Sequence, residues 1–139
     1  MKWRILLLGG VMLGCVAAMA PGGSAPKAAG MLALHGLEKG QWELRERGRT
    51  PPERQPRKVC VGDPAQLMQV GHPRASCSRF VVADEASRAA VTYQCNGAGS
   101  GRTDLRVETS RLVQIDAQGV ANGAPFSLAL EGRRVGNCP

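Results

Sequence analysis

Near the middle of the chain, residues 89–95 read Ala-Ala-Val-Thr-Tyr-Gln-Cys. The side chains at 89, 91, 93 and 95 are apolar or aromatic, and those between them are small or polar. This period of two is typical of a β-strand with one buried and one solvated face. Four other segments alternate in the same way: 42–45, 105–108, 113–116 and 126–131. Strands with a single apolar face favour an antiparallel sheet over buried parallel strands.

Turn-forming residues separate these strands. Residues 96–101 read Asn-Gly-Ala-Gly-Ser-Gly, Asn122-Gly123 precedes Pro125, and Asp84-Glu85 lies in a third expected hairpin turn. The sequence therefore predicts a mainly all-β fold, an antiparallel up-and-down meander of six to seven strands. We expect the strands to form a curved sheet or a partial barrel.

One short helix is expected near residues 64–70. Asp63 is a suitable N-cap, Pro64 fits the first helical position, and Gly71 can adopt the left-handed conformation at the C-terminal end. The side chains expected on its buried side are Leu67, Met68 and Val70.

The first 36 of the 139 residues differ in composition from the rest. Basic residues at 2 and 4, an apolar run and Ala18-Met19-Ala20 predict a signal peptide over residues 1–20. Residues 21–36 are rich in Ala, Gly, Pro and Ser, and predict a flexible linker before a single domain over 37–139. Met12-Leu13-Gly14-Cys15 resembles an imperfect lipobox, so Cys15 is a candidate site of lipid anchoring.

The other four cysteines predict two disulfides in an exported chain. They are Cys60, Cys77, Cys95 and Cys138. Three pairings are open, and we favour Cys60 with Cys77, around the short helix, and Cys95 with Cys138. No close pair of cysteine or histidine ligands is present, so the sequence predicts neither a metal nor another cofactor.

The chain is basic, with a formal net charge of +7. Arginines at 45, 47 and 49 alternate as if on one strand face, and Arg54, Arg57 and Lys58 follow. Such a patch suits an anionic envelope component, whereas the alternative is an ordinary solvated face. Aromatic residues make up only 4% of the chain, which argues against nucleic-acid binding by base stacking. No segment after the leader is apolar enough to cross a membrane.

Three stretches resemble the DUF3617 family of exported bacterial proteins. They are residues 39–44, Lys-Gly-Gln-Trp-Glu-Leu; the spaced cysteines at 60, 77 and 95; and residues 132–139, Gly-Arg-Arg-Val-Gly-Asn-Cys-Pro. Lys39 stands where the family often has proline. The resemblance covers roughly residues 37–139, and it implies an envelope or secreted location and a mostly β domain. It implies no catalytic residue, because the family has no established activity.

Residues that suggest catalysis are few. His72 lies near Ser76 and Ser78, and Asp84 is adjacent to Glu85. No nucleophile elbow surrounds either serine, and the acidic pair is placed in a turn, so we expect a surface histidine and no enzyme activity.

The candidate ligand-facing residues are Trp42, Tyr93 and Phe126. Tryptophan at such a position more often anchors a small core than binds a ligand. The favoured function is a non-catalytic binding or structural β domain, periplasmic or secreted. One alternative is a carrier of an apolar or lipid ligand in a lipocalin-like cup, and another is a protein–protein interaction or inhibitor module.

Overall fold

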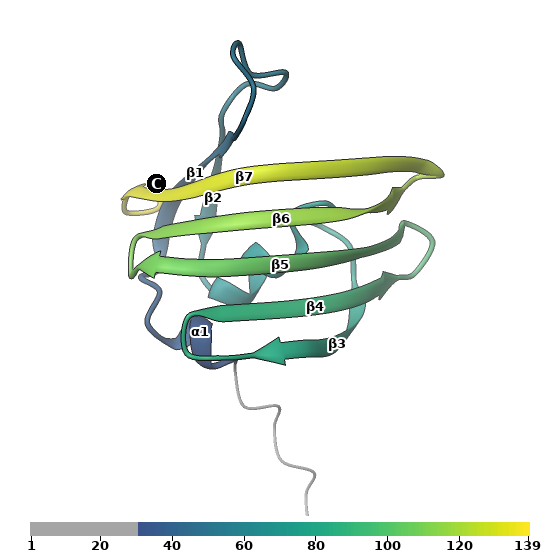
Figure 1. Cartoon of the computed structure of the whole chain (residues 1–139), viewed down its shortest axis with the longest axis horizontal. Helices are drawn as coiled ribbons and strands as arrows, with labels where there is room; N and C mark the ends of the chain where they lie inside the picture. Colours follow the sequence, from purple (N-terminus) through teal and green to yellow (C-terminus); the bar gives the residue numbers. More distant parts are fainter. Residues whose placement is uncertain (1–30) are drawn as a thin grey trace, which may run out of the picture.

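The computed structural model describes residues 31–139, which form one seven-stranded antiparallel sheet (Figure 1). The predicted all-β meander is confirmed. The strands are β1 (Gly40–Glu46), β2 (Arg57–Val61), β3 (Cys77–Asp84), β4 (Arg88–Cys95), β5 (Gly99–Thr109), β6 (Leu112–Ala121) and β7 (Ala124–Gly136). The helical segments are α1 (Leu32–His35) and the 3₁₀ helix η1 (Pro64–Gln69).

The strand order is β2-β1-β7-β6-β5-β4-β3, which is only partly a simple up-and-down order. Strands β3 to β7 follow one another as a meander. The β1–β2 hairpin then packs beside β7, so the first strand pairs with the last. At the β6–β7 turn, Asn122 has φ 50° and Gly123 has φ 80°, as the predicted Asn-Gly hairpin requires. This order places β2 and β3 at opposite edges of the sheet.

Both helical segments cover the same face of the sheet, which we call the inner face. In Figure 1, η1 lies behind β5, and its sheet contacts are mainly with β5, β4 and β2. Leu67, Met68 and Val70 are buried as expected, and Asp63 caps η1 together with Gln66. The segment is a 3₁₀ helix, and Gly71 does not adopt the expected left-handed conformation.

The predicted linker is wrong for residues 31–36. Ala33 and Leu34 of α1 are buried in the core, and the Leu32 amide donates to the Asp84 carboxylate at 2.7 Å. The signal peptide, Cys15 and the rest of the predicted linker lie outside the described residues. Within 31–139, no helix is both long and apolar enough to cross a membrane.

The predicted disulfide pairing is wrong. Cys60 is bonded to Cys138 and Cys77 to Cys95, with Cα atoms 5.4 Å and 4.0 Å apart. Between Cys60 and Cys77 the chain crosses the inner face from one sheet edge to the other, so these two cysteines cannot meet. Cys77 instead lies opposite Cys95 on β4. Each edge strand is thus held by one disulfide, and two such bonds are compatible with an extracellular or periplasmic location.

Candidate functional site

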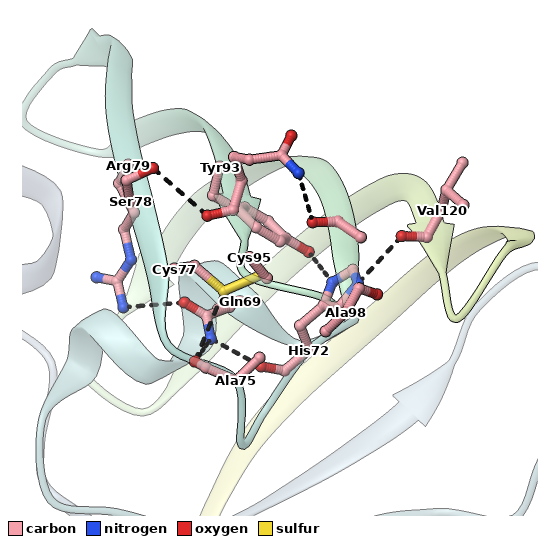
Figure 2. Close-up of a disulfide and its surroundings, with 12 residues drawn as sticks. Gln69, His72, Ala75, Cys77, Ser78, Arg79, Tyr93, Cys95, Ala98 and Val120 are labelled. Atoms are coloured by element: carbon pink, nitrogen blue, oxygen red, sulfur yellow. Dashed lines mark hydrogen bonds between the residues drawn. A yellow bond between two sulfur atoms is a disulfide. The ribbon is translucent and has the colours of Figure 1, made fainter.

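His72 follows η1 and is buried, at 6% exposure, which contradicts the expected surface histidine. Its Nε2 lies 3.0 Å from the Ala98 carbonyl oxygen and 3.1 Å from that of Val120 (Figure 2). Its Nδ1 lies 3.2 Å from the Tyr93 hydroxyl. Carbonyl oxygens only accept hydrogen bonds, so Nε2 carries a proton and donates. In a neutral ring, Nδ1 then accepts from Tyr93, and both nitrogens serve structural bonds.

Glycines leave space around this histidine and its aromatic neighbours. A Cβ atom at Gly99 would lie 3.1 Å from the His72 Nε2, and one at Gly101 would lie 2.5 Å from the Tyr93 hydroxyl oxygen. In sheet register, Tyr93 is opposite Gly101, Gly101 opposite Gly119, and Gly119 opposite Phe126. The two aromatic rings flank the glycines, and the His72 ring meets both edge to face, with centroids 5.4 Å and 5.6 Å away. Burial raises the pKa of Tyr93. Tyr93 therefore belongs to the core, whereas Phe126 is only half-buried and remains accessible.

The other expected reactive groups are not assembled into a catalytic arrangement. Among the described residues, His72 bonds to neither serine, and the Ser78 hydroxyl donates to the Gln94 carbonyl. Asp84 accepts the Leu32 amide, and Glu85 pairs with Arg88. Residues 31–139 also contain no cluster of three metal-ligating side chains.

Trp42 is fully enclosed in the core and does not face a ligand. Its exposure is 0%, and its indole Nε1 donates to the Glu38 carbonyl at 3.0 Å. The alternation of residues 42–45 located this side chain on the inner face, where the core fills the space around it.

The predicted arginine patch is largely neutralised. Strand β1 ends at Glu46, so Arg49 lies in a loop and does not share a strand face with Arg45. Each of four arginines has a carboxylate partner: Arg45 with Glu43, Arg47 with Asp116, Arg49 with Glu53 and Arg54 with Glu46. Within residues 31–139, Arg57 and Lys58 are the members of the patch that form no ion pair.

Arg57 lies between two apolar hollows on the inner face. It is opposite Leu44 in sheet register, and its Nη2 reaches the Val70 carbonyl oxygen at 3.3 Å. A hollow of about 300 Å³ lies on one side and one of about 240 Å³ on the other, and both are lined by Leu44, Arg57 and Val70. We call the two hollows together the Arg57 groove. Its further apolar lining comes from Val59, Val61, Leu67, Phe126, Leu128 and Leu130.

Glu46 fixes the mouth of the groove. Its carboxylate accepts the amides of Glu53 and Arg54 at 2.7 Å and 3.2 Å, and the Arg54 guanidinium at 3.0 Å. These contacts hold the loop between β1 and β2, which projects beyond β7 in Figure 1. Because Arg54 already neutralises Glu46, no carboxylate of residues 31–139 compensates the charge of Arg57.

We expect the loop over residues 47–56 to loosen in acid. Burial of Glu46 acts to raise its pKa, but the amides of Glu53 and Arg54 and the Arg54 charge outweigh this, and the net pKa lies below the ordinary 4.5. A lowered folded-state pKa stabilises the loop above about pH 4.5 and loses that effect as the pH falls through the folded value. Limited proteolysis should cleave this loop faster at about pH 3 than at neutral pH. Glu46→Gln should be cleaved equally fast at both, and an unchanged acid response in that variant would contradict the assignment.

The hollows elsewhere on the described structure are weaker candidates. One of about 790 Å³ is on the opposite, outer face, where Phe80 is 71% exposed and Val120 is 41% exposed. This hollow is shallow and open, so a ligand there would stay largely in contact with solvent. A hollow of about 460 Å³ beside α1 has Lys39, Arg79 and Asp63 in its wall, so an anion there would meet a carboxylate as well as two cations.

Comparisons with family models, curated proteins and solved structures give no match. The resemblance to the DUF3617 family therefore stays a prediction. The chemistry of the Arg57 groove is the basis for a functional proposal.

Proposed function

We propose that this chain is an exported, non-catalytic binding domain of the cell envelope that holds an amphipathic anion in the Arg57 groove. The observation that supports this proposal most strongly is the position of Arg57. It forms no ion pair with any described residue, and it lies between two apolar hollows. An acyl chain would lie against the apolar lining, and its carboxylate or phosphate would bind Arg57.

The chemistry of the guanidinium supports an anionic head group. Arginine presents a planar set of donors that matches a carboxylate or phosphate in a bidentate arrangement. Its present partner is the neutral Val70 carbonyl at 3.3 Å, a long hydrogen bond. Exchange of that bond for a charged one would favour ligand binding, and would open the space between the two hollows.

The size of the groove favours a single acyl chain. Its larger hollow, about 300 Å³, is at the lower end of the roughly 300–1,000 Å³ that small-molecule sites occupy. A lipocalin-like cup is a poor description, because Leu67 and Met68 of η1 fill the space over the middle of the sheet. The site that we propose lies beside η1, under β1, β2 and β7.

Binding without catalysis is supported by the state of the side chains nearest to the groove. His72 is the histidine next to it, and both of its nitrogens are already bonded. Among the described residues, the groove lining contains no serine or lysine that could act as a nucleophile. Its one cysteine, Cys60, is in a disulfide and has no free thiol.

Arg57→Gln is expected to weaken binding of laurate about 10- to 100-fold, because a hydrogen bond to a charged group contributes roughly 1.5–3 kcal/mol. Isothermal titration calorimetry at neutral pH measures this. Arg49→Gln is the matched control, since Arg49 pairs with Glu53 in the exposed loop and does not line the groove, and it should bind laurate normally. Equal affinity of the Arg57→Gln variant and the parent protein would refute the site.

A further inference from the structure

The β3 edge is the most apolar exposed part of the described structure. Of six large hydrophobic side chains that are exposed in residues 31–139, three are consecutive on β3: Phe80 at 71%, Val81 at 46% and Val82 at 44%. A fourth, Leu32 at 56%, lies where its amide binds Asp84. Figure 1 shows β3 as the last strand of the sheet, and within residues 31–139 no strand pairs with its outer side.

An open, apolar edge is a template for a further strand. The opposite edge of the sheet, β2, is protected against pairing with a further strand. It begins with the charged residues Arg57 and Lys58 and follows a loop with three prolines. No comparable charges lie in the middle of β3. Its Cys77–Cys95 disulfide also holds β3 firmly against β4, so the edge is an ordered template.

A β-bulge changes which residues of β3 share a face. Val81 pairs with Val91 and Ala83 with Ala90, so Val82 is an extra residue. Arg79 is opposite Tyr93 and Asp84 is opposite Ala89, and these two β4 residues are both on the inner face. Arg79 and Asp84 therefore share the inner face although they are five positions apart. By the same argument, Phe80 and Ala83 share the outer face.

We infer that two copies of this chain associate through their β3 edges in antiparallel orientation. In the register that we propose, Arg79 is opposite Asp84 of the second copy, Phe80 opposite its Ala83, and Val81 opposite its Val82. Residues that lie directly opposite each other on antiparallel strands have their side chains on the same face of the sheet. In this register Arg79 and Asp84 meet on the inner face, and Phe80 and Ala83 meet on the outer face.

The charges favour a second copy as the occupant. The proposed register forms the Arg79–Asp84 pair twice, once on each side of the two-fold axis, as an isologous interface requires. Arg79 forms no ion pair within the described residues and only a 3.4 Å contact to Gln69. The interface involves one strand from each copy, smaller than the roughly 800 Å² per partner of a standard complex, so the dimer should depend on concentration.

Sedimentation equilibrium of the purified protein, from micromolar to near-millimolar concentration, tests this proposal. The average mass should rise from one protomer to two. Val82→Lys should raise the dimer dissociation constant at least about tenfold. Val135→Lys is the control, because Val135 is similarly exposed, at 45%, but lies on β7, and it should leave the dissociation constant unchanged.

The charge pair gives a second, independent test. Arg79→Asp and Asp84→Arg should each weaken the dimer, and the double variant should restore it, because the swapped charges again face each other. Circular dichroism confirms that every variant is folded. A protein that stays monomeric at all concentrations, or that accepts another polypeptide at β3 in preference to its own copy, overturns the proposal. So does a dimer that Val82→Lys and both single charge variants leave unchanged.

Discussion

Replacing Cys60 and Cys138 with serine is expected to lower the free energy of unfolding by about 4 kcal/mol. The bond closes a segment of 78 residues, and in the chain-entropy model a long loop loses more freedom when it is closed. It also holds edge strand β2 to the C-terminal tail across β1. Urea denaturation followed by circular dichroism measures the loss.

Comparison with the other disulfide gives the control. Cys77 and Cys95 are only 18 residues apart, so their replacement by serine should cost about 3 kcal/mol, less than the first pair. Peptide mapping of the unreduced protein should find Cys60 joined to Cys138. A Cys60–Cys77 peptide, or a loss below about 1 kcal/mol for the first pair, would contradict the description of the sheet edges.

Trp42→Ala should destabilise the protein by about 3–5 kcal/mol, because it leaves a large cavity under the centre of β1. Trp42 is fully buried between β2 and β7, and its indole also holds the Glu38 carbonyl. Denaturant unfolding at neutral pH measures the change. The outcome separates a core role from a ligand-binding role, which the sequence left open.

Trp42→Phe is the informative companion variant. It retains most of the buried ring, so it should unfold at a denaturant concentration between those of the parent and Trp42→Ala. It should bind laurate as the parent does, since Trp42 does not line the Arg57 groove. If Trp42→Ala were as stable as the parent, the packing that we describe around β1 would be wrong.

The strands that alternate regularly could be predicted from the sequence, and the irregular ones could not be placed. Residues 89–95 became β4 with Val91 and Tyr93 inside. The period of two fails in β3, where Phe80, Val81 and Val82 are consecutive and a bulge adds one residue. Local patterns also cannot show that β1 pairs with β7, and this pairing is what separates Cys60 from Cys77.

The candidate site depended on contacts that no local pattern specifies. His72 is buried because its ring lies between Tyr93 and Phe126 and bonds to the carbonyls of Ala98 and Val120, all of which come later in the chain. Arg57 was predicted as one member of a basic patch. Arg57 differs from the other arginines of the patch because each of those four forms an ion pair with a carboxylate. One of these carboxylates, that of Asp116, is far from its partner Arg47 in the sequence. Of the predicted patch, Arg57 and Lys58 form no ion pair within residues 31–139, and of these two only Arg57 lines the groove.

Backbone amide NMR of the ¹⁵N-labelled protein during titration with laurate tests the central claim most directly. We predict shifts concentrated on Leu44, Arg57 and Val70, which border both hollows, with little change at Thr92 and Gln118 on the outer face. Dodecyltrimethylammonium, which has the same chain and a cationic head, should shift these signals far less. Shifts concentrated on the outer face, or equal responses to the two amphiphiles, would contradict an anion site at Arg57.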